Sequence, residues 1–414
     1  MDYIIDYHTF PNGLRLVHKT VKNTQIAHCG FILNIGSRDE NIHQQGLAHF
    51  WEHMAFKGTK KRNSFYILNR LESVGGEINA YTTKEKICFY ASFLENHYQR
   101  AFELLTDITF EPTFPTNQIE RERGVILEEM AMYLDSPDDN LQDELDTLIF
   151  KGHSLGYNIL GTTQSVSGFE QKDFQTFINE NMNTEEIIFS SVSTHSFQTI
   201  KKWAEKYLSN IPKKSNNQKN RTQFSNYQPQ NSTKFHHATQ AHCAIGTTAY
   251  SVQEEKRLPF FILSNILGGP ALNSRLNWSL REKNGLVYSV DANYQPYTDT
   301  GLFAIYFATE PKQSDKSLNL VLKELKNLRT QKLTAIQLHK AKEQVLGQLA
   351  MAEEGNQSFM LMMGKSWLDN GKIEKIEEVF AQIRQITSEQ LLEVANEIWD
   401  EKRLSILKYL PQKD

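Results

Sequence analysis

Two hydrophobic periodicities alternate along the chain and predict a mixed fold. Short β-rich segments, such as residues 13–18, are followed by longer stretches in which apolar residues recur at helical spacing, such as residues 318–328. Both halves of the sequence show this alternation, so we predict an α+β fold in which sheets pack against helices. No run approaches the ~18 consecutive apolar residues that a membrane-spanning helix requires.

A polar break divides the chain. Residues 212–232 are crowded with Lys, Asn, Gln, Ser and Pro and lack apolar periodicity, which is typical of a linker. We therefore predict an N-terminal domain at 1–211 and a C-terminal domain at 233–414. The sequence TQIAHC at 24–29 is echoed by TQAHC at 239–243, and each leads into a strand and a long helical stretch. This short echo is a weak indication that the two domains are repeats of one another.

The most informative chemical signal is the pentapeptide His49-Phe50-Trp51-Glu52-His53. Histidines four residues apart on a helix share one face, so both imidazoles can reach one cation, and zinc binds imidazole readily. Glu52 lies on the same face and could accept a proton from a water molecule that attacks a carbonyl. H-x-x-E-H is the reversed form of a metallopeptidase motif, but a string this short also arises by chance.

The helical wheel supplies context for the motif. Leu47, Phe50, Trp51 and Met54 fall in one arc, and Phe56 extends the opposite arc that carries the histidines. An ordinary amphipathic helix with a solvated polar face is the plain alternative. The aromatic ring of Phe56 argues against it, because a ring of that size should be covered, and we therefore predict a sheltered site.

A third metal ligand is predicted from a second helix at residues 116–133. Glu122 and Glu129 are seven residues apart, so they stack on one face, whereas Glu128 points to the far side as a solvated charge. Carboxylates directed into a core are costly unless they are paired or bind a metal. We choose Glu129 as the third ligand and Glu122 as the partner that orients a ligand histidine. A buried salt bridge between Glu122 and an arginine is the alternative. The apolar arc expected to surround the two carboxylates consists of Ile119, Val125, Ile126, Met130, Met132 and Tyr133.

These residues resemble the pitrilysin and insulinase zinc metallopeptidases, in the branch that includes the mitochondrial processing peptidase. In that family a run like E-R-x-V-I-x-E-E follows the inverted motif, as residues 120–129 do here, and residues 55–59 and 76–82 agree as well. The resemblance implies that Asn79 and Ala80 lie on an edge strand that pairs with an extended peptide substrate. Ordinary strand residues are the alternative for both, since strand sequence alone does not reveal an exposed edge.

The second half carries no metal motif but shares a further feature with the family. Arg281 and Tyr288 are seven residues apart, around a helix end that Gly285 should cap. The resemblance implies that both reach the active site from the C-terminal domain, where the phenol would donate a hydrogen bond to an oxyanion and the guanidinium would bind a substrate carbonyl. Without the resemblance, Arg281 is a favourable charge at a helix C-terminus and Tyr288 a core residue.

Composition changes this picture little. The 414 residues carry a net charge of −4, which gives no reason to expect nucleic acid or an anionic membrane as a partner. Cys29, Cys88 and Cys243 are too few and too scattered for a disulfide framework. The amino terminus has neither a basic region nor a long apolar core, so we expect a cytoplasmic protein.

The sequence thus predicts a zinc endopeptidase with one Zn²⁺ per chain, which hydrolyses unfolded peptides or presequence-like segments with Glu52 as general base. The resemblance implies two homologous α+β domains, built on sheets rich in antiparallel pairs, that form half of a clamshell. A homodimer, or a heterodimer with a related subunit, would complete it. A peptidase-fold subunit that binds peptides or scaffolds an assembly without cleaving them is the alternative. A metal hydrolase acting on a small amide is a third possibility.

Overall fold

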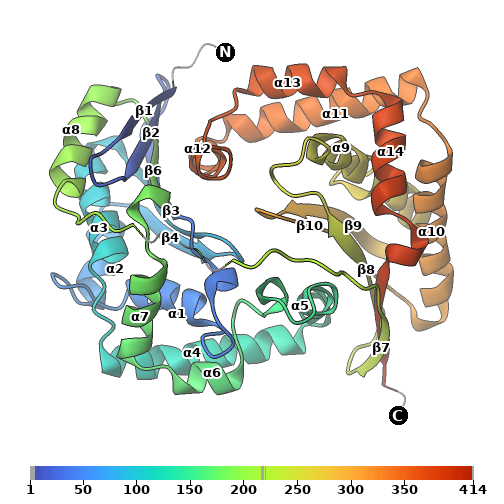
Figure 1. Cartoon of the computed structure of the whole chain (residues 1–414), viewed down its shortest axis with the longest axis horizontal. Helices are drawn as coiled ribbons and strands as arrows, with labels where there is room; N and C mark the ends of the chain where they lie inside the picture. The colour runs from blue at the N-terminus through green and yellow to red at the C-terminus, as the bar shows by residue number, and fades with distance from the viewer. Residues whose placement is uncertain (1–4, 216–218, 220, 413–414) are drawn as a thin grey trace. The chain divides into compact units, whose positions relative to one another are not determined.

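The computed structural model of the chain describes residues 5–215, 219 and 221–412 (Figure 1). The chain forms two compact units, each of which combines helices with one β-sheet, so the predicted α+β class is confirmed. Unit 1 consists of Met1–Met130, Tyr157–Arg221 and Met351–Ile373, and unit 2 consists of Ala131–Gly156, Thr222–Ala350 and Glu374–Asp414.

The sheet of unit 1 has six strands in the order β1-β2-β6-β3-β5-β4. Its pairs are antiparallel except for β2 with β6, which is parallel. β4 therefore lies at one edge of the sheet, with β5 as its paired neighbour. The strands are β1 Ile5–Thr9, β2 Arg15–Thr20, β3 Ile26–Leu33, β4 Glu77–Thr82, β5 Ile87–Leu94 and β6 Ile187–Ser193.

Helices cover one face of this sheet and enclose an aromatic core. The rings of Phe102 and Phe189 stack with their centroids 3.9 Å apart, and Trp51 and Phe89 are fully buried beside them. Burial of each such side chain contributes roughly 1.5–3 kcal/mol, so this core fixes the helices against the strands. The helices are α1 Leu47–Ala55, α2 Ser64–Glu72, α3 Tyr98–Phe110, α4 Thr116–Asp135, α6 Thr163–Gly168, α7 Gln171–Asn181 and α8 Phe197–Leu208.

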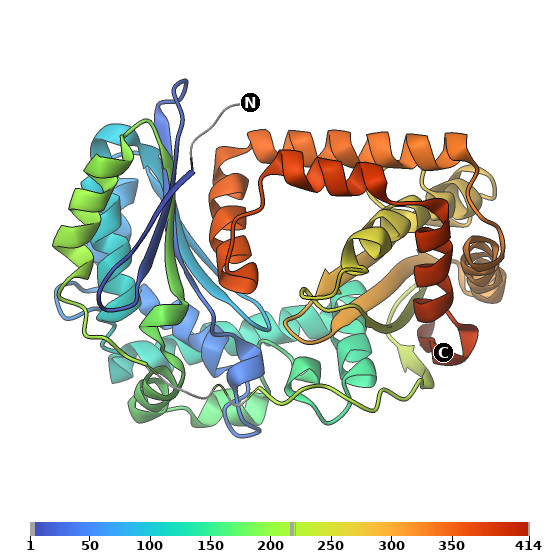
Figure 2. The same ribbon diagram turned by 45° about the horizontal axis from the view of Figure 1, so that its top comes forward.

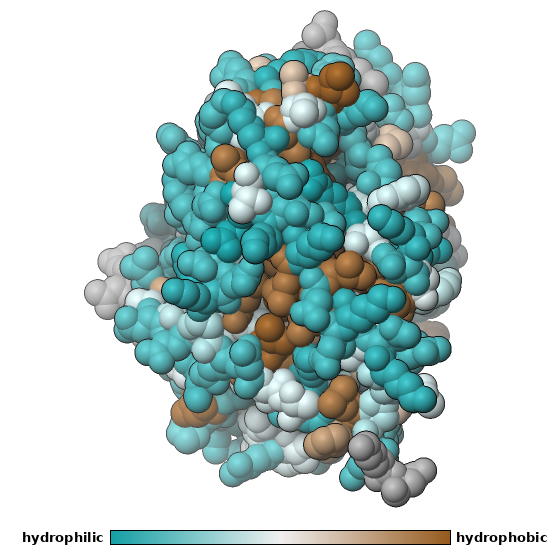
Figure 3. Space-filling model, turned by 90° about the vertical axis from the view of Figure 1, so that its right-hand side faces the viewer, coloured by the Kyte–Doolittle hydropathy of each residue, from teal (hydrophilic) through white to brown (hydrophobic). Residues whose placement is uncertain are grey.

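The sheet of unit 2 has five strands in the order β7-β11-β8-β10-β9, with β7 and β11 parallel and the other pairs antiparallel. The strands are β7 Asn231–His236, β8 Ala241–Ala249, β9 Val287–Pro296, β10 Gly301–Thr309 and β11 Ser405–Pro411. The helices packed with them are α5 Pro137–Ile149, α9 Arg257–Gly268, a π-helical turn at Asn277–Glu282, α10 Ser314–Thr330, α11 Ala335–Glu354, α13 Ile376–Gln385 and α14 Ser388–Ile398. One face of the molecule is mostly hydrophilic, with hydrophobic residues gathered near its centre (Figure 3).

The two sheets repeat one topology. The strands β2 to β6 lie in the order β2-β6-β3-β5-β4, and the strands β7 to β11 lie in the equivalent order β7-β11-β8-β10-β9. In both sheets the first strand of the series pairs in parallel with the last. The echo at 24–29 and 239–243 marks equivalent strands, since it leads into β3 in one unit and β8 in the other. The similarity that six residues only hinted at therefore extends through the whole sheet.

Each half of the sequence gives one helix to the other unit. α12, Asn356–Asn370, lies against the first sheet (Figure 2). Its side chains Met360 and Met363 pack in one buried cluster with Val17 and Ile188 of that sheet. α5 packs on β8 and β11 of the second sheet. One boundary between the two units falls between residues 221 and 222, inside the linker predicted at 212–232. The predicted domains, 1–211 and 233–414, are continuous ranges and therefore do not include the exchange of α5 and α12. The hydrophobic pattern of α5 and α12 does not reveal which sheet each helix covers, because an amphipathic helix can pack on any apolar face.

Most of the predicted elements are present. Residues 318–328 lie in α10 and residues 116–133 in α4, while residues 13–18 overlap β2. The broad apolar arc on α4 is wrong at Val125 and Met132, which are 50% and 63% exposed. Only a narrow stripe of α4 is buried, because the helix lies at the border of the core. Among the described residues, no helix is both long and apolar enough to cross a membrane.

Candidate metal centre

Helix α1, which carries His49 and His53, begins directly after a left-handed backbone turn at Gly46. Gly46 has φ 91°, a conformation that favours glycine, and a Cβ there would lie 2.4 Å from the carbonyl oxygen of Leu160. The buried carboxylate of Glu40 accepts hydrogen bonds from the backbone N–H groups of Gly46 and Ala48, at 2.9 and 2.7 Å. Glu40 thus binds the free donors at the helix N-terminus. The apolar arc of α1 is buried as predicted.

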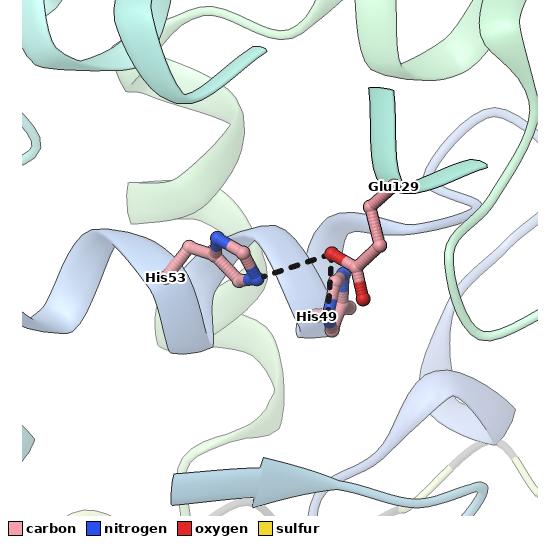
Figure 4. A group of neighbouring side chains, drawn as sticks. All are labelled: His49, His53 and Glu129. Carbon is pink, nitrogen blue, oxygen red and sulfur yellow. Dashed lines mark ion pairs between the residues drawn. The ribbon is translucent and has the colours of Figure 1, made fainter. Parts of the chain in front are cut away.

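Two imidazoles of α1 and one carboxylate of α4 converge within unit 1 (Figure 4). His49 Nε2 and His53 Nε2 lie 3.9 and 3.6 Å from the same oxygen, Oε2 of Glu129. The two imidazole centroids are 4.6 Å apart. In the described part of the chain, these three residues are the one group of at least three His, Cys, Asp or Glu side chains arranged to hold a metal ion. The structure therefore brings together all three residues that the sequence predicted as ligands.

His49 is buried without a hydrogen-bond partner. The side chain is 11% exposed, its Nδ1 has no partner, and its Nε2 approaches Glu129 only to 3.9 Å. Burial, together with the neighbouring His53, lowers the pKa of His49 to about 3. The imidazole is therefore neutral at pH 7, which is the form that binds a metal. A buried polar ring without a partner is costly unless a ligand satisfies it.

The imidazole of His53 is oriented by Glu122, which contacts the ring nitrogen that faces away from Glu129. His53 Nδ1 lies 3.2 Å from Glu122 Oε2, and Lys57 Nζ lies 2.6 Å from the other oxygen, Oε1. Burial raises the pKa of Glu122, but the hydrogen bonds from His53 and Lys57 outweigh it and lower that pKa overall. The carboxylate then keeps the Nδ1 proton of His53 and leaves Nε2 free as a donor to a metal. The buried salt bridge weighed for Glu122 also exists, with a lysine in place of an arginine.

Glu52 lies beside the cluster and contacts the edge strand. Its Oε2 accepts a hydrogen bond of 2.6 Å from the hydroxyl of Thr82 at the end of β4. Burial raises the pKa of Glu52, and the hydrogen bond from Thr82 partly offsets this rise. A raised pKa brings a carboxylate closer to the range in which it exchanges protons near neutrality.

The donor set fits a zinc ion. Tetrahedral zinc with bonds of about 2.0–2.1 Å places neighbouring ligand atoms about 3.3–3.4 Å apart. The separations of 3.6 and 3.9 Å between Glu129 Oε2 and the two imidazole nitrogens exceed that spacing by a few tenths of an ångström, and all three ligand atoms lie within 4.8 Å of one another. Two neutral imidazoles and one carboxylate are also a ligand set that catalytic zinc sites use, with a fourth position open.

The two residues expected on the edge strand occupy it. Asn79 and Ala80 lie in the middle of β4, where Asn79 is exposed and Ala80 packs against the core. Because β4 is paired on one side by β5, the backbone groups on its other side face no neighbouring strand among the described residues. An extended segment can add to such an edge.

Arg281 and Tyr288 lie in unit 2. Tyr288 is 85% exposed on the edge strand β9, and the guanidinium carbon of Arg281 lies 5.6 Å from its ring centroid. Gly285 between them has φ 58°, as the predicted cap requires. The core position considered for Tyr288 is therefore wrong, and its phenol is available to a binding partner.

Sequence reasoning missed three residues around this cluster: Glu40, Lys57 and Thr82. The period-2 alternation of β4 could have placed Thr82 on the same face as Ala80. The packing of that face against α1 is a long-range contact that spacing does not encode.

The comparisons with known proteins agree with this architecture. The sequence model described as "Insulinase (Peptidase family M16)" matches residues 15–163, and the model described as "Peptidase M16 inactive domain" matches residues 168–345. The chain is 29% identical to the uncharacterized zinc protease YmxG of Bacillus subtilis, over 96% of each chain. It is 31% identical to an uncharacterized zinc protease of Rickettsia bellii, over 95% of each.

Two solved structures share the fold. A protease from Helicobacter pylori has a TM-score of 0.91 at 19% identity, covering 99% of this chain and 100% of that one. A peptidase M16 inactive-domain protein from Pseudomonas fluorescens also has a TM-score of 0.91, at 18% identity, covering 99% and 98%. This chain thus has the two-domain α+β fold that these two structures share. This chain belongs to the insulinase family of peptidases, M16.

Proposed function

We propose that this chain is a zinc-dependent endopeptidase that binds one Zn²⁺ and cleaves unfolded peptides or presequence-like segments. The observation that carries the proposal is the convergence of His49, His53 and Glu129 beside the buried carboxylate of Glu52. The names of the curated relatives, which are zinc proteases, support the same reaction class.

Each residue of the site has a chemical role in this proposal. His49, His53 and Glu129 hold the metal, and Glu122 keeps His53 in the tautomer whose Nε2 is free. A zinc ion held there would supply Lewis-acid polarisation of the scissile carbonyl and of the attacking water. Glu52 accepts the proton of that water and later delivers it to the leaving amide nitrogen.

The substrate is proposed to be an extended peptide because the site adjoins an open strand edge. Asn79 and Ala80 on β4 would pair with the peptide by main-chain hydrogen bonds, which recognise no particular side chain. Arg281 and Tyr288 would bind the carbonyl oxygen of the scissile bond and stabilise its developing charge. The high exposure of Tyr288 supports such a role, since its phenol has no shell of packed neighbours.

The experiment that tests the proposal is digestion of a mixed peptide library by the zinc-loaded chain, read by mass spectrometry. We expect cleavage of long peptides that stops with a chelator, and we expect Glu52→Gln to abolish it while zinc stays bound. Glu128→Gln is the matched control, because Glu128 is exposed on the same helix as Glu129 and should leave cleavage unchanged. Full cleavage by Glu52→Gln would refute the assignment of the base.

The alternatives give different results in the same experiment. A peptide-binding subunit without turnover would retain peptides and cleave none of them. A hydrolase of small amides would release no fragments from long peptides. Sedimentation of the zinc-loaded chain tests the proposed homodimer, because a monomer that cleaves peptides would show that no second copy is required. The three buried, unpaired cysteines support the proposed cytoplasmic location, where thiols stay reduced.

A further inference from the structure

Thr82 is the described residue whose side chain makes a hydrogen bond to Glu52. Its hydroxyl lies 2.6 Å from Oε2, which is the short distance expected when an O–H donates to an ionised carboxylate. A hydroxyl has a single proton to donate, so this bond holds one carboxylate oxygen and leaves the other free. Without it, the carboxylate would rotate freely about its last torsion, which has no sharp minima of its own.

The position of Thr82 follows from the alternation of β4. Ile78 and Ala80 pack on the core that α1 covers, whereas the ring of Tyr81 lies 4.8 Å from the ammonium of Lys365 on α12, which packs on the opposite face of the sheet. Thr82 has the same parity as Ala80 and therefore points to α1. Because threonine is β-branched, its χ1 is stiff in a strand, and the direction of the hydroxyl is set by the backbone.

The turn that follows Thr82 is fixed by ion pairs from distant segments. Its residue Glu85 pairs with Arg38 at 2.6 Å, and Lys86 pairs with Asp369 of α12 at 2.7 Å. Within the turn, Thr83 N–H donates to the Lys86 carbonyl at 2.8 Å. The turn after β4 is therefore anchored by two ion pairs from distant segments and one internal hydrogen bond, and these contacts hold the end of the strand that carries Thr82.

We infer that Thr82 is a positioning residue for the reaction, which holds one oxygen of the Glu52 carboxylate so that the other faces the attacking water. This inference rests on the proposed function. It adds to that function a second duty for β4, because the strand proposed to align the peptide also aligns the group that receives the proton. Substrate pairing on β4 and orientation of the base are thereby coupled through one rigid strand.

The test compares Thr82→Val with Thr82→Ser. Valine keeps the shape and loses the hydroxyl, whereas serine keeps the hydroxyl and loses a methyl group. We expect Thr82→Val to lower kcat roughly tenfold to hundredfold, as loss of a hydrogen bond to a charged group does, while KM stays within about twofold. Thr82→Ser should restore kcat to within about threefold of the parent chain. Thr20→Val is the matched control, because Thr20 ends β2 in the same sheet, and three strands separate β2 from β4.

A readout independent of activity keeps the inference falsifiable. In crystals of the zinc-loaded chain, the Glu52 carboxylate should have one orientation, and in Thr82→Val it should be spread over several at unchanged zinc occupancy. Unchanged kcat and an unchanged carboxylate in Thr82→Val would overturn the inference, as would a failure of Thr82→Ser to restore kcat. The proposed function fails separately, through cleavage that survives Glu52→Gln.

Discussion

The two units share one sheet topology but differ in the helix that follows the second of its five equivalent strands, which is β3 in unit 1 and β8 in unit 2. In unit 1 this helix is α1, which carries His49, Glu52 and His53 on the face opposite its apolar arc. In unit 2 it is α9, whose sequence RLPFFILSNILG contains no histidine or acid. α9 buries most of its residues in the core of its own unit. The same sheet topology therefore occurs both with the candidate metal cluster of α1 and α4 and, in unit 2, without a cluster of this kind among the described residues.

The edge strands show the same division. β4 in unit 1 has six residues, and Thr82 at its end donates a hydrogen bond to Glu52. β9 in unit 2 has ten residues and an exposed Tyr288. Both edges occupy the same position in their sheets. The candidate metal ligands of the described residues thus lie in unit 1, and the edge strand of unit 2 presents an exposed phenol.

The largest expected effect comes from removing a ligand on α1. His53→Ala should release the zinc and lower kcat/KM by about a thousandfold or more, because metal polarisation is worth several kcal/mol in the transition state. Metal analysis after dialysis and peptide cleavage measure the two effects. His43→Ala is the control, since His43 is an exposed histidine in the preceding loop. Retention of zinc by His53→Ala would show that the three-residue cluster is not the binding site.

The next effect tests whether β9 contributes to the reaction. Tyr288→Phe should lower kcat by roughly a hundredfold to a thousandfold at unchanged zinc content, as the loss of one oxyanion donor does. Tyr7→Phe on the edge strand β1 removes another exposed phenol and should have no effect on turnover. Equal rates for Tyr288→Phe and the parent chain would confine catalysis to unit 1.

A smaller effect, on zinc affinity, is expected from substitution of Glu122, the carboxylate that contacts Nδ1 of His53. Glu122→Gln should weaken zinc binding about tenfold to hundredfold, because the amide no longer fixes the tautomer of the histidine and Lys57 loses its partner. Competition with a chromogenic chelator measures the affinity. Glu120→Gln changes an exposed carboxylate on the same helix, and it should match the parent chain. If both variants bind zinc equally well, Glu122 serves only the salt bridge with Lys57.

The sequence predicted the parts of the site that depend on residues close together in the chain, and it did not predict the contacts between distant segments. His49, Glu52 and His53 share one helical turn, and Glu129 lies on an amphipathic helix, so local periodicity was enough to choose them. The bond from Thr82 to Glu52 joins a strand to a helix thirty residues away. The exchange of α5 and α12 depends on which apolar face each helix meets, and hydrophobic pattern alone does not distinguish one face from another.

Acid should weaken the sheet of unit 1 through His18 on β2. The side chain is fully buried, with Nε2 2.9 Å from the carbonyl oxygen of His195 and Nδ1 3.0 Å from the hydroxyl of Ser191. Burial lowers the pKa of His18 to about 4, although its bonds to His195 and Ser191 and the charge of Glu95 raise it. Because the carbonyl can only accept, Nε2 carries the proton of the neutral ring, and Ser191 donates to Nδ1.

Between pH 6.5 and about 4 the unfolded chain binds a proton at His18 that the folded chain does not, so stability falls as the pH is lowered through this range. The contribution lost is about 3 kcal/mol at most. Denaturant unfolding with a chelator present should show a shallower pH slope for His18→Gln than for the parent chain. Hydrogen exchange should show β2 losing protection before β7, and equal loss in both strands would contradict this assignment.

The smallest expected effect distinguishes the two exchanged helices. α12 is anchored to the first sheet by Asp369 and Lys86, whose side chains are 20% and 12% exposed. α5 is anchored to the second sheet by Glu144 and Lys234, 2.8 Å apart, but these side chains are 28% and 53% exposed. Water screens the second pair more, so the interaction energy should be about 0.5–1 kcal/mol for Lys86 with Asp369 and close to zero for Lys234 with Glu144.

Double-mutant cycles built from Lys→Met and acid→amide substitutions measure both energies by denaturant unfolding. The cycles are comparable, because each joins an acidic residue of an exchanged helix to a lysine of the unit that the helix covers, Lys86 in the turn before β5 and Lys234 in β7. Since Lys86 lies in the turn after Thr82, the first cycle should also lower kcat slightly, while the second should leave kcat unchanged. Equal interaction energies in the two cycles would show that burial does not distinguish the anchors, and that the reciprocal exchange holds both units by apolar packing alone.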